Sequence, residues 1–171
     1  AELGAQAGLI EPDIITEEFV LKAGGKLDYS QKFKCDPGAN YFKVHSFDAS
    51  TLDPQVAVPH SPANSASVVE VDKAEIDQFY VGACTGAKLN DLKMVASILK
   101  GKKVATGKRL TVAPASSQIL KDATKDGITE IILDAGANLL PPGCGACAGY
   151  GVGFLAKEEV CLATTARNFQ G

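Results

Sequence analysis

The sequence has no tryptophan, one methionine, two histidines, and only 7 phenylalanines and 4 tyrosines among its 171 residues. So few aromatic side chains argue against a stacking platform for single-stranded nucleic acid. The 17 basic residues do not outnumber the 20 acidic ones, and a net charge of -3 offers no electrostatic footprint for DNA, RNA or an anionic membrane surface. No apolar run reaches the roughly 18–20 residues that a membrane helix requires. We therefore expect no nucleic-acid partner and no membrane partner.

Targeting signals are also missing from the sequence. It begins Ala1-Glu2-Leu3-Gly4 without an initiator methionine, a basic n-region or a signal-peptide cleavage pattern. It ends in the polar stretch 167–171, with no helix to close it. We expect a piece of a longer, cytoplasmic polypeptide.

The five cysteines do not form a disulfide framework in this interpretation. Their number is odd and their spacing irregular, which favours a reducing compartment, where clustered cysteines more often bind metal or carry out redox chemistry. Cys35 lies in a polar turn and Cys161 in the apolar run 160–163, so both are expected to have no ligand role.

Cys144 and Cys147 lie in the glycine-rich stretch Pro-Gly-Cys-Gly-Ala-Cys-Ala-Gly-Tyr-Gly. Two intervening residues allow both sulfurs to face one centre, and the glycines allow the backbone to approach it. The spacing suits structural zinc, an iron–sulfur cluster or a redox dithiol, and two buried core cysteines are the remaining interpretation. Cys84 follows the apolar run 79–83 and is, by itself, as consistent with a core residue as with a ligand.

The amino-terminal part of the chain is predicted to contain little regular structure. A helix is expected at 14–23, ended by Gly24 and Gly25, and a strand at 41–47 with His45 on its polar face. The prolines in 48–67 predict an irregular, stiff loop. A domain boundary is expected near 65–75, dividing the chain into 1–70 and 71–171.

Beyond residue 75 the pattern alternates between strands and helices, which is typical of an α/β fold with a parallel sheet. Ser116 is a suitable helix N-cap, and the apolar segment 128–135 is compatible with a helix or a strand. Strands are predicted at 76–81, 109–113 and 159–164, and helices at 90–100 and 116–126.

Three segments, in this order and spacing, resemble the aconitase superfamily: Gly82-Ala83-Cys84-Thr85-Gly86 followed by Asp91-Leu92, Pro142-Gly143-Cys144-Gly145-Ala146-Cys147, and Thr164-Thr165-Ala166-Arg167-Asn168-Phe169-Gln170-Gly171. The similarity is strongest to large subunits of two-chain hydro-lyases of the 3-isopropylmalate dehydratase and homoaconitase type. It implies an aconitase-like three-layer α/β/α fold. Residues 1–70 would be part of the second domain, with its proline-rich loop, and 71–171 a truncated, cluster-bearing third domain.

The resemblance also implies a [4Fe–4S] cluster, because Cys84, Cys144 and Cys147 match the family's three ligands. The fourth iron then has no protein ligand and acts as a Lewis acid, whereas a fourth cysteine would leave an electron carrier.

Three further residues match family positions that contact the reacting groups. Arg167 matches an arginine that binds a substrate carboxylate, and Asn168 a residue near the cluster that bonds its sulfurs or the substrate. Glu2 matches an acidic residue that contacts the iron-bound oxygen, which gives it a catalytic role.

The implied reaction isomerises a hydroxy-di- or tricarboxylate, such as 2-isopropylmalate to 3-isopropylmalate in leucine biosynthesis, by dehydration and rehydration. The family's amino-terminal lobe is missing, as is a second arginine expected just beyond Gly171. The catalytic serine belongs to a swivelling domain that two-chain members carry on a small partner subunit. We therefore expect the isolated residues to have little or no dehydratase activity. A structural zinc or dithiol module built on Cys144 and Cys147 is the alternative.

Overall fold

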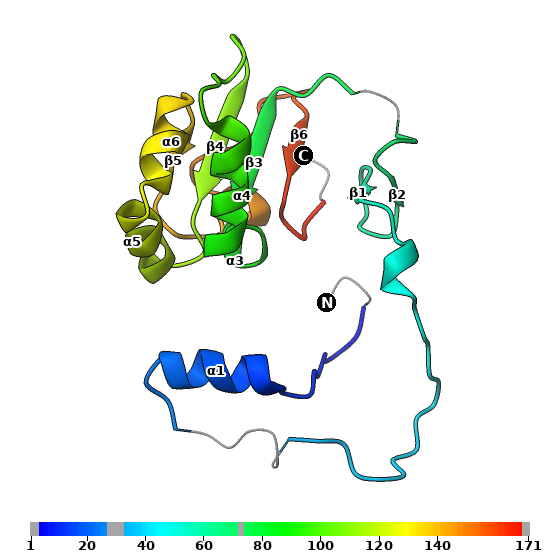
Figure 1. Ribbon diagram of the computed structural model, residues 1–171. Helices are drawn as coiled ribbons and strands as arrows, with labels where there is room; N and C mark the ends of the chain where they lie inside the picture. The colour runs from blue at the N-terminus through cyan, green and yellow to red at the C-terminus, as the bar shows by residue number, and fades with distance from the viewer. Residues whose placement is uncertain (1–3, 27–32, 72–73, 169–171) are drawn as a thin grey trace. The chain divides into compact units, whose positions relative to one another are not determined.

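The computed structural model describes residues 4–26, 33–71 and 74–168 (Figure 1). The chain divides into two compact units, Ala1–Leu52 and Asp53–Gly171. The domain boundary expected near residues 65–75 stays a prediction. Within the described ranges, no helix has the length and apolar character needed to cross a membrane.

The first unit contains helix α1 (Ile14–Lys22), which confirms the helix expected there. Asp13 caps it by accepting a hydrogen bond of 3.0 Å from the backbone N–H of Thr16. The helix ends where Gly24 adopts a φ of +85°, a conformation that favours glycine.

The strand expected at 41–47 is wrong, because no strand forms there. Alternation of apolar and polar residues predicts a strand only where a neighbouring strand can take up its backbone hydrogen bonds. These residues are exposed, and the described part of the chain supplies them with no such neighbour. The rings of His45 and Phe47 stack instead, with centroids 6.2 Å apart. A 3-10 turn, η1 (Ala49–Thr51), follows.

The expectation of a wholly irregular loop over 48–67 is also wrong. Strands β1 (Gln55–Ala57) and β2 (Ser65–Ser67) pair as an antiparallel hairpin. Pro54 immediately precedes β1, while Pro59 and Pro62 lie in the connecting loop, so no proline removes a hydrogen-bond donor from the ladder.

The second unit also contains a four-stranded, entirely parallel sheet with the strand order β5-β4-β3-β6. This confirms the α/β class with a parallel sheet. The segment 128–135, for which both states were open, forms helix α6, and Ser116 caps α5 as expected. The strands are β3 (Gln78–Gly82), β4 (Arg109–Ala113), β5 (Asn138–Leu139) and β6 (Cys161–Ala163). The helices are α3 (Ala83–Gly86), α4 (Leu89–Leu99), α5 (Ser117–Lys125) and α6 (Ile128–Asp134).

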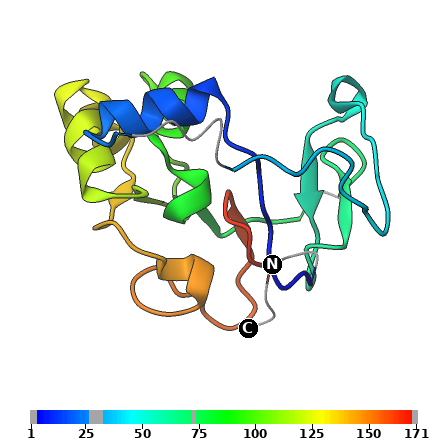
Figure 2. The same ribbon diagram turned by 90° about the horizontal axis from the view of Figure 1, so that it is seen from below.

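The two faces of β3 have different neighbours. Phe79 and Val81 face helices α4 to α6 and belong to the hydrophobic core or pack against it. Gln78, Tyr80 and Gly82 alternate with them and therefore face the opposite side. There the sheet is covered by the glycine-rich cysteine segment rather than by one of these helices (Figure 2). The buried core residues are Val81, Ala87, Leu92, Ala96, Leu110, Val112, Ala123, Ile128, Ile132 and Ala137.

Candidate functional site

The carboxyl edge of the sheet collects the residues singled out from the sequence. Cys84 lies in α3, directly after β3, and Cys144 follows β5 at the start of the 3-10 turn η2 (Gly145–Ala148). Arg167 and Asn168 come a few residues after β6. Parallel strands end at the same edge, which is where open α/β sheets bind their ligands. Figure 2 views the sheet from this edge.

The turn that carries Cys84 is closed by the side chain of Thr164. The Thr164 hydroxyl accepts a hydrogen bond of 3.2 Å from Gly82 N–H and donates one of 3.0 Å to the Gly86 carbonyl. A β-carbon at Gly86 would lie 2.4 Å from the Thr164 carbonyl oxygen, so only glycine fits there. Between these two ends, Ala83 has a φ of +63° and Cys84 is exposed. Thr164, which directly follows β6, thus fixes both ends of the turn that follows β3.

The second cysteine segment is fixed at both ends by β3. The Tyr80 hydroxyl donates to the Cys144 carbonyl at 3.0 Å, and the Gln78 amide donates to the Gly153 carbonyl at 2.7 Å. Within the turn, Cys147 N–H donates to the Cys144 carbonyl at 3.1 Å. Cys144 is exposed and Cys147 half-buried, so both thiols are accessible at a turn whose backbone is anchored to the sheet.

Tyr80 lies between the two cysteine turns and is only 1% exposed. A β-carbon at Gly82 would lie 2.4 Å from its ring, and one at Gly145 would lie 2.8 Å from its hydroxyl. Burial raises the pKa of the Tyr80 phenol, and the neighbouring Cys147 and Cys144 raise it further. The phenol therefore remains protonated and donates its hydrogen bond.

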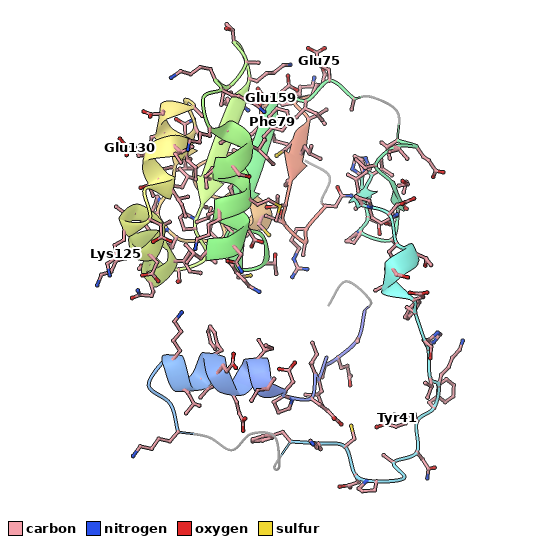
Figure 3. All side chains as sticks on the ribbon, in the orientation of Figure 1. Tyr41, Glu75, Phe79, Lys125, Glu130 and Glu159 are labelled. Carbon is pink, nitrogen blue, oxygen red and sulfur yellow. The ribbon has the colours of Figure 1, made fainter. Side chains whose placement is uncertain are left out.

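A polar network joins the cysteine segment to the rest of the sheet. Gln78, which is buried, accepts a hydrogen bond of 3.1 Å from the Arg109 Nε, and Arg109 pairs with both carboxylate oxygens of Glu159 at 2.8 and 2.5 Å. Hydrogen bonds from Arg109 and from the Ala156 N–H lower the pKa of Glu159 to about 2. Glu159 lies at the opposite end of the sheet from α3 (Figure 3), so the network supports the segment from a distance.

A cleft of about 550 Å³ opens beside β3 and β6. Arg167 lines it, together with the apolar side chains of Val56, Val68 and Leu162. Asn168 also lines the cleft, but its Nδ2 donates to the carbonyls of Ala57 at 3.2 Å and Val58 at 2.8 Å. Its amide nitrogen is therefore directed to the β1–β2 hairpin.

The described residues contain no group of three histidine, cysteine, aspartate or glutamate side chains close enough to share one metal ion. Single-ion zinc would require such a group, normally with four ligands. A cluster spaces its thiolates more widely, because each one binds a different iron. Cys84, Cys144 and Cys147 lie on two separate turns at one edge of the sheet, and as soft sulfur donors they have the chemistry that the irons of a cluster prefer.

The remaining residues of interest lie elsewhere. Glu2 falls outside the described residues. Cys35 is exposed in the first unit, and Cys161 is half-buried in β6, where burial raises the pKa of its thiol. Tyr80, Gln78 and Thr164 support the site but were not singled out from the sequence. For Gln78 and Tyr80, the sequence signal was that two hydrogen-bonding side chains occupy alternate positions of an otherwise apolar strand.

Comparison with known proteins identifies the relatives of this chain. The aconitase family (aconitate hydratase) matches residues 68–171. Over 170 residues the chain is 44% identical to the 3-isopropylmalate dehydratase large subunit of Thermodesulfovibrio yellowstonii, covering 99% of this chain and 40% of that protein. The same subunit of Campylobacter concisus is 44% identical over 172 residues, covering 99% and 41%, and that of a Sulfurihydrogenibium species is 45% identical over 170 residues, covering 99% and 39%. The chain thus spans about two fifths of these curated relatives.

Proposed function

Because the chain belongs to the aconitase family, we propose that it is the cluster-bearing portion of an iron–sulfur hydro-lyase. Its reaction isomerises a hydroxy-di- or tricarboxylate by dehydration and rehydration. The observation that carries the proposal is that Cys84, Cys144, Cys147 and Arg167 all follow strands of one parallel sheet and come from the same edge.

Cys84, Cys144 and Cys147 are the proposed ligands of a [4Fe–4S] cluster. When bound, the cluster supplies an iron without a protein ligand, which acts as a Lewis acid toward a hydroxyl and a carboxylate. The contribution of this chain is to hold the three thiols on anchored turns. Thr164 fixes the Cys84 turn, and Tyr80 and Gln78 fix the segment that follows Cys144.

Arg167 is the proposed substrate-binding residue. Its guanidinium is planar and permanently charged, and it can bind a carboxylate through two parallel hydrogen bonds. The same cleft presents Val56, Val68 and Leu162, which suit an alkyl substituent. A carboxylate beside an alkyl group describes 2-isopropylmalate and 3-isopropylmalate, and we propose this pair as substrate and product.

Asn168 and Glu2 complete the proposed site with smaller roles. The Nδ2 of Asn168 positions the hairpin that forms one wall of the cleft, and its side-chain oxygen is the atom proposed to contact substrate. Glu2 is proposed to have a catalytic role next to the reacting oxygen of the substrate, on the family resemblance alone.

The proposed partner is a small subunit that carries the swivelling domain and the catalytic serine. The relatives are named as large subunits, which supports a second chain. The isolated 171 residues are accordingly proposed to have little or no dehydratase activity.

Anaerobic reconstitution with ferrous iron and sulfide tests the cluster. We expect visible charge-transfer absorption and an EPR signal upon reduction. Cys84→Ser, Cys144→Ser and Cys147→Ser should each lower the iron content, whereas Cys35→Ser, at an exposed cysteine of the other unit, should not. Bound zinc without absorption, or no metal at all, would contradict the proposal.

A further inference from the structure

The two cysteine turns are separated by one buried side chain. The ring of Tyr80 lies against Gly82, which opens the Cys84 turn, and its hydroxyl lies against the backbone of Cys144 and Gly145. Both glycines are needed for this contact, since a β-carbon at either would come within 2.8 Å of Tyr80. The hydroxyl end of the Tyr80 side chain therefore lies against both turns.

A rigid cluster requires its ligands at a fixed spacing. Thr164 closes the Cys84 turn, and Gln78 ties the far end of the other cysteine segment to β3. Tyr80 is the side chain of this group whose atoms lie against both turns, and it is only 1% exposed. An aromatic ring suits this task, since it has few rotatable bonds and cannot be compressed.

We propose that Tyr80 is a positioning residue, whose side chain sets the spacing between the Cys84 turn and the Cys144–Cys147 turn for cluster binding. This inference rests on the proposed function, because it concerns the same three thiols. The ring lies against the Cys84 turn, and the hydroxyl meets the other turn and donates a hydrogen bond to the Cys144 carbonyl.

Phe79 provides a matched control. It is the preceding residue of the same strand, also aromatic, but it packs against the core between the sheet and the helices, on the side of the sheet opposite to Tyr80. Phe79→Ala removes a ring of similar size without touching either cysteine turn. The pair Tyr80→Ala and Phe79→Ala thus separates loss of spacing from general loss of packing.

The experiment uses the whole chain, reconstituted anaerobically with iron and sulfide. The readouts are iron per chain, the EPR spectrum of the reduced cluster and the rate of iron loss to a chelator, each compared with the urea midpoint of the apoprotein. In Tyr80→Ala we expect iron loss to accelerate by about tenfold or more, the range seen when groups supporting metal ligands are removed, together with an altered EPR spectrum. Tyr80→Phe keeps the ring against Gly82 but removes the hydroxyl that meets the Cys144 turn, so we expect both values to lie between those of Tyr80→Ala and the original chain.

Two results would overturn the inference while leaving the proposed function intact. One is a Tyr80→Ala cluster with unchanged EPR spectrum and iron-loss rate. The other is a Phe79→Ala variant that loses iron as fast as Tyr80→Ala at a similar urea midpoint, because the effect would then follow stability alone. If the unsubstituted chain takes up no cluster, the proposed function itself fails.

Discussion

At the scale of single residues, Glu159 is held in its ionised form by two hydrogen bonds from Arg109 and one from the Ala156 backbone, which lower its pKa from 4.5 to about 2. Its folded-state pKa lies below its unfolded value, so folding is favoured above pH 4.5. This contribution is lost as the pH falls from about 4.5 towards 2.

We therefore expect Glu159→Gln to flatten the acid side of the stability profile. Urea unfolding of the two proteins between pH 7 and pH 3 should show their midpoints converging as the pH falls. Protonation of Glu159 removes the stabilising charge of its carboxylate from the original chain, and the variant lacks that charge at every pH. Glu158→Gln is the matched control, because Glu158 is exposed and its nearest cation, Lys157, is 3.9 Å away. Midpoints that keep a constant separation across this range would contradict the assignment.

Asn168 gives a second prediction at this scale. Its Nδ2 donates to the carbonyls of Ala57 and Val58, and Asn168→Asp replaces those donors with a carboxylate. The carboxylate would face carbonyl oxygens, so we expect the β1–β2 hairpin to lose protection against amide hydrogen exchange, at a cost of about 1 kcal/mol. Exchange at the Val58 and Val68 amides, which donate to the carbonyls of Asn64 and Pro54 across the hairpin, is the measurement, with exchange in α4 as the internal control. Unchanged protection in the hairpin would show that Asn168 does not fix it.

At the scale of elements, the α3 turn depends on the absence of a side chain at Gly86. A β-carbon there would lie 2.4 Å from the carbonyl oxygen of Thr164. We expect Gly86→Ala to lower the free energy of unfolding by about 1–3 kcal/mol, since backbone on both sides must move, and to lower the iron content of the reconstituted chain.

Gly143→Ala is the control for this variant. Gly143 precedes the first cysteine of its segment, and the nearest atom to an added β-carbon, the Pro141 carbonyl oxygen, is 4.0 Å away. Chemical denaturation and iron analysis of the two variants should therefore differ. Equal effects would mean that the Thr164 contact is unimportant.

The success of sequence reasoning also differed between elements. β4 and the helices α4 and α5 were predicted within a residue or so, because their apolar period and caps are local properties of the chain. The strand at 41–47 was wrongly predicted and the β1–β2 hairpin was missed for a common reason. Whether a segment becomes a strand depends on the segment that pairs with it, and the local sequence pattern does not identify that partner. The supporting roles of Tyr80 and Thr164 were not predicted for the same reason, since their hydrogen-bond partners are distant in sequence.

At the scale of the whole molecule, the hydrophobic core is confined to one stretch of the chain. Among the residues that the structure describes, the buried hydrophobic side chains all lie within the range 80–137, in the second unit. We expect a chain reduced to residues 53–171 to unfold cooperatively, with a urea midpoint close to that of the whole chain. Circular dichroism across a urea titration measures this. A broad transition, or a much lower midpoint, would show that residues 1–52 take part in stabilising the sheet.

The hydrogen bonds from Thr164 to the ends of the Cys84 turn have a consequence for biosynthesis. During translation Cys84 leaves the ribosome well before Thr164, the residue that closes its turn, and β6 is the last strand of the sheet to be made. The nascent chain thus exposes its thiols before they have a defined arrangement. Iron and sulfide delivered to the growing polypeptide would meet loose cysteines, so insertion of the inorganic group is expected to follow completion of the sheet.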